Sequence, residues 1–470
     1  MNRFRFVCVF LCVTGATLFA RPHPRPLVYQ PLMPASIQPG SPDFIVTVSG
    51  ANFFSGSVVH WNGSPLPTAF ISRSRLQATV PAADVATAGT ASVTVVNPAP
   101  GGGRSNDIYF PVRVPASTVT MVPGHPRTPG GVSVGDFNSD GHLDVLVSKG
   151  TLNTGALNID TLLGKGDGTF SFLVGGNSPY SAPIAVFPAD FNGDGKLDAA
   201  VAENFGGGQI YLGNGNGTFT EVPFAGFNGS VAAAADMNRD GNLDIIIVAN
   251  NFFNNYIQVY PGNGDGTLGN PTLPTLTGLV GSSVAVGDFN GDGKLDFAVP
   301  GIVLSPFYKF ISVYLGNGDG TVQPAINTLT RDIYSIVTAA DVNGDGKLDL
   351  VVDGRCVLLG DGNGYFTPGA CVHMPAGLFA IATDLGDFNG DGKIDIVALG
   401  GFLNTPPFRQ KLTIALGNGD GTFQDPIVID AGVSPPLAYF SGLGVGDFNN
   451  DGKLDVAVGS KNQTFVFQQP

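Results

Sequence analysis

The chain has 470 residues, of which 43% are apolar and 13% charged, so it can form two or three domains with buried cores. It carries 37 acidic and 23 basic residues, a formal charge of −14 that argues against a nucleic-acid partner, which requires a basic surface. The 67 glycines and 35 prolines recur periodically, so they indicate turns and not disorder.

The first 20 residues (1–20) have the pattern of a secretory signal peptide. Arg3 and Arg5 precede an apolar run that begins at Phe6 and ends near Ala20. The run is short for a transmembrane span, although an uncleaved anchor stays open as an alternative, and no later segment is apolar enough to cross a bilayer. We therefore predict export, with the protein secreted, extracellular or displayed at the cell surface. Residues 21–30, with three prolines, predict an extended linker.

Residues 31–114 contain short alternating apolar runs separated by turns, which predict a small β-sandwich. Four stretches carry a recognisable pattern: Ile37-Gln-Pro-Gly, Val48-Ser-Gly-Ala-Asn-Phe53, Val59-His-Trp-Asn-Gly63 and Val95-Val-Asn-Pro98. Together they resemble an IPT/TIG immunoglobulin-like domain. The resemblance implies a spacer or contact module, and we expect Trp61 to pack in its core.

From residue 115 to residue 470 one unit recurs. The nine-residue pattern D-x-N-x-D-G-x-[LI]-D occurs seven times, beginning at Asp136, Asp190, Asp236, Asp288, Asp341, Asp387 and Asp447. Successive starts are 54, 46, 52, 53, 46 and 60 residues apart. A period near 50 residues is typical of solenoids, propellers and arrays.

The residue types in this pattern suit a calcium loop. Side-chain oxygens at positions 1, 3 and 5 converge if the backbone curls, Gly at position 6 permits the turn, and Asp at position 9 closes the shell. Position 7 is Lys in five copies, whose ammonium cannot be a ligand, so we expect its backbone carbonyl to bind. An EF-hand is excluded because strand-like residues follow, and Mg²⁺ is disfavoured by its strict octahedral geometry. A metal-free Asx turn is the alternative.

The predicted ligands lie at positions 1, 3, 5, 7 and 9 of each loop, with position 7 acting through its carbonyl. They are Asp136, Asn138, Asp140, His142, Asp144; Asp190, Asn192, Asp194, Lys196, Asp198; Asp236, Asn238, Asp240, Asn242, Asp244; Asp288, Asn290, Asp292, Lys294, Asp296; Asp341, Asn343, Asp345, Lys347, Asp349; Asp387, Asn389, Asp391, Lys393, Asp395; and Asp447, Asn449, Asp451, Lys453, Asp455. Up to seven structural Ca²⁺ ions would cancel the formal charge of −14.

Each unit places an apolar stretch before the loop, a β-branched run after it, then a variable insert and a second apolar run that ends in a Gly-rich turn. This order predicts four strands per unit, as in a propeller blade. The combined motifs resemble the FG-GAP/VCBS repeats of integrin-α-like propellers, which implies a calcium site between strands 1 and 2 of each blade. The Gly-rich turns are read as strand 3–4 hairpins, with second metal sites as the alternative.

The expected fold is therefore all-β, a seven-bladed β-propeller (115–470) preceded by the immunoglobulin-like sandwich. The last unit stops after its third strand, so we expect a strand near residues 117–121 to complete that blade and leave no open edge. Cys356 and Cys371 flank Gly360-Asp-Gly-Asn-Gly364 symmetrically, as partners across a hairpin would. In an oxidising compartment they can form a disulfide, and two free buried thiols are the alternative.

Aromatic residues gather in the 2–3 and 4–1 connections, which a four-stranded meander places on the face opposite the calcium loops. The candidate ligand face comprises Phe252, Phe253, Tyr256, Phe307, Tyr308, Phe402, Phe408, Tyr439 and Phe440. A cluster of exposed aromatics on one face marks a binding site, whereas isolated ones need no explanation. The alternative is that these residues cap the gaps between blades.

These patterns predict a monomeric calcium-binding adhesion module whose ligand is a protein or a glycan. A polysaccharide lyase or hydrolase is an alternative that needs an acid/base constellation, but the five His are scattered and none lies in a catalytic motif. A multivalent lectin is a further alternative, which would repeat one pocket between each pair of blades. The inserts differ too much in length and composition to favour that.

Overall fold

The computed structural model describes residues 25–100, 102–116, 119–123, 131–150, 157–178, 183–203, 208–222, 231–251, 254–272, 279–280, 283–304, 307–330, 336–375, 378–402, 409–433, 442–459 and 464–469. The predicted signal peptide lies outside these residues. Within them the chain is all-β, as predicted, apart from the short 3-10 turn η1 (Ala82–Val85). No helix in this part of the chain is long and apolar enough to cross a membrane.

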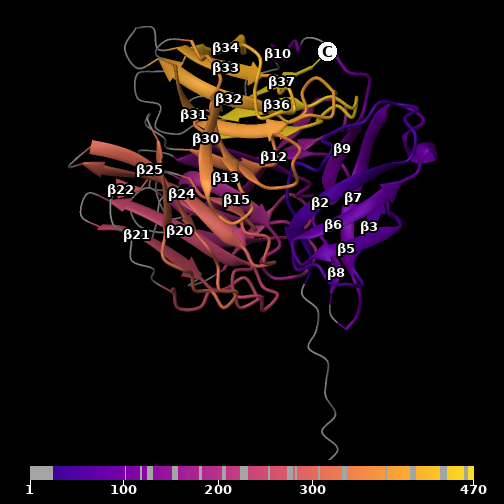
Figure 1. Ribbon diagram of the computed structural model, residues 1–470. Helices are drawn as coiled ribbons and strands as arrows, with labels where there is room; N and C mark the ends of the chain where they lie inside the picture. The colour runs from indigo at the N-terminus through magenta and orange to yellow at the C-terminus, as the bar shows by residue number, and fades with distance from the viewer. Residues whose placement is uncertain are drawn as a thin grey trace, which may run out of the picture.

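The N-terminal domain, residues 25–116, contains two antiparallel sheets (indigo in Figure 1). In the first sheet the order is β1 (Leu27–Val28), β2 (Phe44–Ala51), β6 (Arg75–Val80) and β5 (Thr68–Ser72). In the second it is β4 (Ser64–Pro65), β3 (Val58–Trp61), β7 (Gly89–Asn97) and β8 (Gly103–Arg104), and β9 (Ile108–Val112) also pairs with β7.

The inward-facing residues of the two sheets form one apolar core. In β2, Val46 and Val48 are buried and their neighbours are less so, which is the period-2 pattern of a strand with one covered face. The indole of Trp61 lies 5.1 Å from the ring of Phe110 between centroids, and its exposed fraction is 2%. Trp61 therefore packs in the core, as expected.

Part of the predicted linker belongs to the first sheet. Leu27 and Val28 pair with Ala51 and Gly50, so this end of the 21–30 segment is an edge strand of the first sheet. The proline spacing suggested an extended segment, and an extended segment beside an open sheet edge can add to that sheet.

Seven further antiparallel sheets, the repeat region, follow in residues 119–469 as the structure describes them. Their strands are β11 (Gly131–Gly135), β12 (Asp144–Gly150), β13 (Leu157–Gly164), β14 (Phe170–Ser178); β15 (Pro183–Ala189), β16 (Asp198–Glu203), β17 (Gln209–Gly213), β18 (Phe219–Glu221); β19 (Val231–Ala235), β20 (Asp244–Asn251), β21 (Asn254–Tyr260); β22 (Leu279–Val280) and β23 (Ala285–Gly287), both paired with β24 (Asp296–Leu304), then β25 (Phe307–Tyr314), β26 (Ile326–Thr330); β27 (Val337–Ala340), β28 (Asp349–Val352), β29 (Cys356–Gly360), β30 (Phe366–Cys371); β31 (Leu378–Gly386), β32 (Asp395–Phe402), β33 (Arg409–Ala415), β34 (Ile427–Val433); and β35 (Gly442–Gly446), β36 (Asp455–Gly459), β37 (Thr464–Gln468), β10 (Val122–Pro123).

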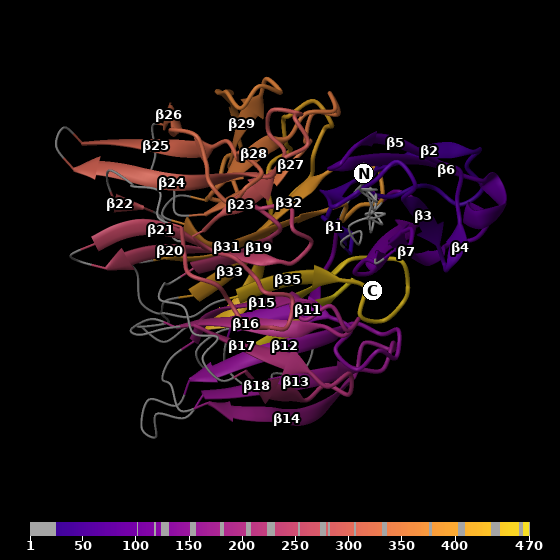
Figure 2. The ribbon, with the colours of Figure 1, turned by 90° about the horizontal axis from the view of Figure 1, so that it is seen from below.

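The first strands of neighbouring sheets lie beside one another around a common centre (Figure 2). Strand β11 contacts both β15 of the next sheet and β35 of the last, so the sequence of contacts closes on itself. Seven apolar clusters each join two neighbouring sheets, including one between the last sheet and the first. The sheets therefore bury their faces against one another and not against a separate layer.

The last sheet is completed from the other end of the repeat region. Val122 and Pro123 in β10 pair with Gln468 and Phe467 in β37. The closing strand was predicted near residues 117–121, and in the structure the strand that completes the last sheet is β10, at Val122–Pro123. Val119 and Met121, within the predicted range, instead bury their side chains in an apolar cluster with the sixth and seventh sheets.

Candidate metal centre

Each of the seven acidic loops joins the first and second strands of one sheet. Position 1 directly follows the first strand, and position 9 is the first residue of the second strand. The apolar residue at position 2 is at most 3% exposed in every copy and packs between sheets, as expected for Phe137, Phe191, Met237, Phe289, Val342, Phe388 and Phe448. The glycine at position 6 has a positive φ in all seven loops, for example 88° at Gly195, where an L side chain would be strained.

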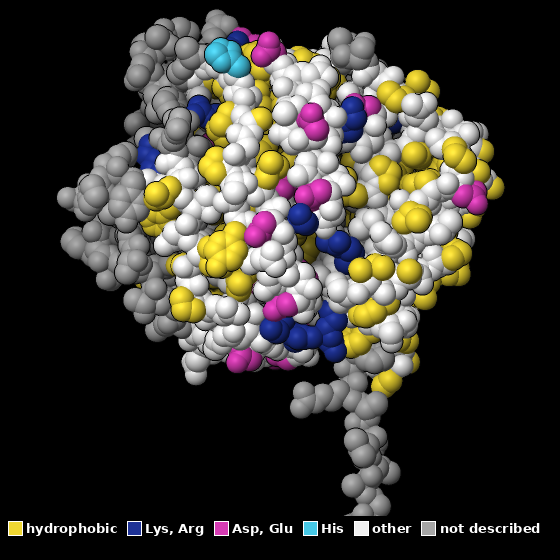
Figure 3. All heavy atoms as spheres, in the orientation of Figure 1, with side chains coloured by type: hydrophobic (Ala, Val, Ile, Leu, Met, Phe, Trp, Pro, Cys, Tyr) yellow, Lys and Arg dark blue, Asp and Glu magenta, His cyan; other side chains and the backbone are white. Residues whose placement is uncertain are grey.

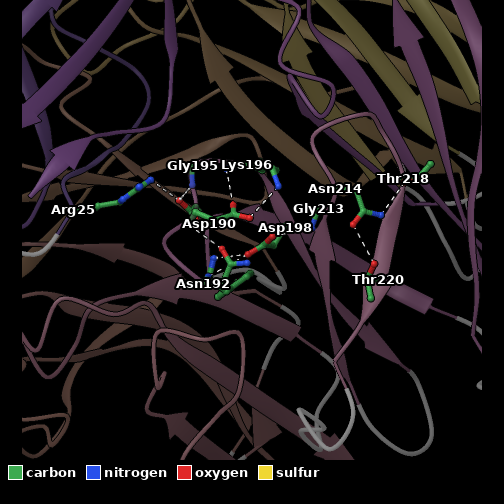
Figure 4. Close-up of polar contacts among 12 residues, drawn as sticks. Arg25, Asp190, Asn192, Gly195, Lys196, Asp198, Gly213, Asn214, Thr218 and Thr220 are labelled. Atoms are coloured by element: carbon green, nitrogen blue, oxygen red, sulfur yellow. Dashed lines mark hydrogen bonds and ion pairs between the residues drawn. The ribbon is translucent and has the colours of Figure 1, made fainter. Parts of the chain in front are cut away.

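Loop 2, residues 190–198, shows the shared pattern of hydrogen bonds (Figure 4). The backbone N–H of Asp194 donates to Oδ1 of Asp190 at 3.0 Å and to Oδ1 of Asn192 at 2.9 Å. The N–H of Gly195 donates to Oδ2 of Asp190 at 2.8 Å, and the N–H of Lys196 donates to Asp194 at 2.9 Å. Positions 1, 3 and 5 are therefore folded round one turn, as the spacing predicts.

Position 9 is anchored differently. Its carboxylate is 0% exposed in all seven loops and accepts a backbone N–H from position 2 with Oδ2, as in Phe137 to Asp144 at 2.8 Å. Its Oδ1 accepts the N–H of the glycine that opens the Gly-rich turn, as in Gly164 to Asp144 at 2.8 Å. In the last sheet, which has no such turn, Gln469 provides the N–H at 2.8 Å to Asp455. The Gly-rich motif is therefore part of the same structure as the acidic loop.

Burial raises the pKa of these position-9 carboxyls, and the carboxylates at positions 1 and 5 raise it further, while the two N–H donors lower it. The pKa rises to about 7 in Asp144, Asp198, Asp244, Asp296 and Asp455, to about 6 in Asp349, and well above its usual range in Asp395. Each loop thus holds a buried carboxyl whose charged form is disfavoured by its surroundings among the described residues.

The loops are not closed cages of carboxylates. Among the described residues, no three His, Cys, Asp or Glu side chains are arranged to hold a metal ion. The predicted shell also draws on an amide and a backbone carbonyl. In five loops the ammonium of the position-7 Lys lies near the position-5 Asp, as in Lys294 to Asp292 at 2.9 Å. This side-chain contact was not predicted, because position 7 was expected to act only through its backbone.

One loop contains an oxygen with no protein partner. Oδ1 of Asp288, at position 1 of loop 4, is buried and accepts no hydrogen bond within the described residues. A buried carboxylate oxygen without a donor is costly unless a cation or water satisfies it. The atoms of the loop that could bind a metal are carboxylate, amide and carbonyl oxygens, which are the ligands that Ca²⁺ prefers. The residues of the loop therefore fit a calcium ion.

The Gly-rich turns are hairpins in the structure. In the first, Oδ1 of Asp167 accepts the N–H of Thr169 at 2.9 Å and its hydroxyl at 2.6 Å. These bonds lower the pKa of Asp167, the hydroxyl bond being the larger cause. The aspartate thus caps its own turn. Cys356 and Cys371 face each other in β29 and β30 and form a disulfide with an S–S distance of 2.08 Å.

Most of the predicted ligand face lies outside what the structure describes. Phe252, Phe253, Phe408, Tyr439 and Phe440 fall outside the described residues. Strands β25 and β32 include three further candidates, whose side chains are not described: Phe307, Tyr308 and Phe402. The remaining candidate, Tyr256, lies in β21, is partly buried and pairs with Ala249. The ligand face stays a prediction.

The histidines of the described residues lie apart. His60 is in the N-terminal domain, where Nδ1 bonds the carbonyl of Gly63 at 3.0 Å. His142 belongs to loop 1, and its Nδ1 lies 3.1 Å from the amide of Asn450 in loop 7. His373 is exposed after β30. The contact between His142 and Asn450 links the first and last loops and supports the closed order of the sheets.

Comparison with protein families agrees with this architecture. The family model of the FG-GAP-like repeat matches residues 136–201, 190–247, 236–299, 302–352 and 402–458, and that of the IPT/TIG domain matches residues 32–112. The chain belongs to the FG-GAP-like repeat family and carries an N-terminal IPT/TIG domain. The resemblance predicted from the motifs is confirmed. Repeats and domain of these kinds indicate a protein-binding or adhesion-type module.

Among curated proteins, the phosphatidylinositol-glycan-specific phospholipase D of Rattus norvegicus is 30% identical over 164 residues, which is 28% of this chain and 19% of that protein. The Homo sapiens protein of the same name is 32% identical over 162 residues, with the same coverage. The match thus spans about a fifth of these relatives' length.

Among solved structures, BBS1N in complex with ARL6DN is similar at 11% identity and a TM-score of 0.45, over 75% of this chain and 97% of that one. An auxiliary nutrient binding protein from Bacteroides ovatus is similar at 11% identity and a TM-score of 0.36, over 95% of this chain and 98% of that one.

Proposed function

We propose that this protein is an exported, calcium-stabilised β-propeller of seven blades that acts as a protein- or glycan-binding module. The seven sheets are the blades, each with its first strand toward the common centre. Two observations support this count: apolar clusters that join every neighbouring pair of sheets, and the pairing of β10 with β37 in the last sheet. A sheet completed from both ends of the repeat region has no open edge at the join.

The observation that carries the calcium proposal is the buried carboxylate at position 9, repeated seven times. Each is fully buried and adjoins two more carboxylates of its loop, at positions 1 and 5. A buried anion beside like charges is unfavourable unless a cation is close. A calcium ion at positions 1, 3, 5, 7 and 9 would supply that charge and fix the loop that joins the first two strands, so folding would depend on calcium.

The binding role rests on the two domain types, and the aromatic residues opposite the loops are the proposed contact surface. Export rests on the signal-like pattern of residues 1–20, and the disulfide between Cys356 and Cys371 is consistent with an oxidising compartment. The phospholipase match covers too little of those enzymes to support a catalytic proposal.

Thermal unfolding with calcium removed tests the proposal. The full chain is melted in excess EGTA and again as calcium is titrated back, with magnesium titrated in parallel as the matched control. We expect a saturable rise in melting temperature with calcium, well above that with magnesium, and several calcium ions bound per chain by calorimetry. An unchanged melting temperature and no heat of binding would overturn the metal assignment.

A further inference from the structure

The N-terminal domain covers the face of the repeat region on which the acidic loops lie. Its contacts with position 1 of the loops are mostly neutral. The hydroxyl of Ser74 donates to Asp288 at 2.6 Å, and the hydroxyls of Ser36 and Thr90 donate to Asp387 and Asp447. The side chain of Asn52 bonds Asp236. These groups add no charge to the loops they contact.

Guanidinium groups of the N-terminal domain also contact other loops, through backbone carbonyls: Arg75 donates to Gly346 in loop 5 and Arg113 donates to Phe388 in loop 6. In loop 2 a guanidinium contacts the position-1 carboxylate itself. Nη1 of Arg25 lies 2.8 Å from Oδ2 of Asp190, and this is the ion pair that joins the N-terminal domain to a position-1 aspartate within the described residues (Figure 4). Arg25 is held at this place by its neighbours. Its carbonyl accepts a hydrogen bond from the side-chain amide of Asn52 at 3.1 Å, and residues 25–30, the N-terminal arm, include β1.

The charges of loop 2 are therefore more fully paired than those of loop 4. Besides Arg25 at Asp190, the ammonium of Lys196 lies 3.3 Å from Asp194, so two of the three carboxylates face a positive group. Both oxygens of Asp190 also accept backbone N–H groups. In loop 4 the only ammonium is that of Lys294, and Oδ1 of Asp288 has no partner among the described residues.

We infer that Arg25 and calcium compete for Asp190, so that calcium binding in loop 2 releases the N-terminal arm. This rests on the proposed calcium function of the loops. A guanidinium beside a position-1 carboxylate repels a divalent ion bound to the same carboxylate, whereas a hydroxyl donor does not. Two unit charges at 4 Å interact by about 1 kcal/mol even in water, and a divalent ion doubles this, which corresponds to roughly thirtyfold in affinity.

The competition is reciprocal, because the factor by which Arg25 weakens calcium binding is the factor by which calcium weakens the arm's attachment. The Arg25 side chain is 38% exposed, so the freed guanidinium can be solvated by water. Figure 3 shows Lys and Arg side chains along the line where the N-terminal domain meets the repeats, which places other positive groups near this border. The attachment of the N-terminal arm to loop 2 thus depends on the calcium concentration.

The test compares calcium binding by the full chain in three forms: wild type, Arg25→Gln and Arg25→Lys. The Gln variant removes the charge, and the Lys variant keeps it. Arg104→Gln is the matched control, because Arg104 pairs with Asp107 inside the N-terminal domain. Calorimetry gives the number and affinity of sites. Amide hydrogen exchange of Val28 and Tyr29 measures whether the N-terminal arm is attached. Their N–H groups donate to Oδ1 of Asn106 at 2.8 Å and to the Ser49 carbonyl at 2.9 Å, respectively.

In the wild type and in Arg104→Gln we expect faster exchange of Val28 and Tyr29 as calcium fills loop 2. Arg25→Gln should strengthen calcium binding at one site by tenfold or more and make the exchange independent of calcium, while Arg25→Lys should behave as wild type. Equal affinities in Arg25→Gln and wild type would overturn the inference. Absence of any calcium binding would instead overturn the proposed function, and the inference with it.

Discussion

The N-terminal domain and the repeat region are both all-β, but they are stabilised in different ways. The sandwich has one apolar core around Trp61 and Phe110, with polar groups at its surface. The repeat region divides its apolar contacts among seven small clusters and buries a carboxylate in each of its sheets. A small repeated unit cannot enclose a core of its own. We infer that each unit compensates with a charged loop that calcium completes.

A substitution in the core of the sandwich should cause the largest loss in the free energy of unfolding. Replacing Trp61 with Ala removes a fully buried side chain and should lower the free energy of unfolding of the N-terminal domain by about 3–5 kcal/mol. Calorimetry should then show an earlier transition for this domain, while the calcium-dependent transition of the repeats changes little. Phe70→Ala, at a side chain that is 38% exposed, is the control. A joint shift of both transitions would show that the two regions unfold as one unit.

In the repeat region, substitution at position 9 of a loop should reduce stability and calcium binding most. Asp296→Ala leaves the buried N–H groups of Phe289 and Gly316 without their acceptor, at a cost of about 2–3 kcal/mol. It should also reduce the number of bound calcium ions by one. Asp319→Ala, in the exposed Gly-rich turn of the same sheet, should leave the calcium count unchanged. Full calcium stoichiometry in Asp296→Ala would exclude position 9 from the site.

A smaller effect is expected at Asp384, a carboxylate on β31 outside the loops. Burial raises its pKa to about 6, while the N–H groups of Leu385 and Val445 lower it. A folded pKa above the unfolded value of about 3.9 means that the folded state binds the proton more tightly, so stability falls as pH rises through 6.

Asp384→Asn should therefore stabilise the calcium-loaded protein by about 1–3 kcal/mol at pH 8, and by less at pH 5. Denaturant unfolding at the two pH values measures the difference, with Asp425→Asn at an exposed position as the control. A difference that does not change with pH would mean that the Asp384 carboxylate is not the titrating group.

The repeat architecture could be predicted because the same two motifs recur from unit to unit. The acidic motif fixes where strands 1 and 2 meet, and the Gly-rich motif fixes the next hairpin. Both motifs turned out to be joined by the bond from Gly164 to Asp144 and its counterparts. The fixed spacing between them was a signal that could have suggested this bond.

The contacts of the N-terminal domain could not be predicted in the same way. The residues that contact the loops are single residues without a motif, and they reach their aspartates because two regions far apart in the sequence pack together: Ser36, Ser74, Thr90 and Arg25. The exact start of the closing strand was missed for a similar reason. The pairing of β10 with β37 depends on how the first and last sheets of the repeat region meet. Local strand propensity does not encode that arrangement.

That pairing also sets an order of events in synthesis. Strand β10 is made before the first acidic loop, and its partner β37 is made after all seven acidic loops. At usual elongation rates the wait is on the order of tens of seconds. Throughout that time the earlier sheets form an open arc with an unpaired strand at its start. Until β37 is made, the unpaired edge can pair with neighbouring nascent chains, so the risk of misassembly lasts for most of the synthesis of the repeat region.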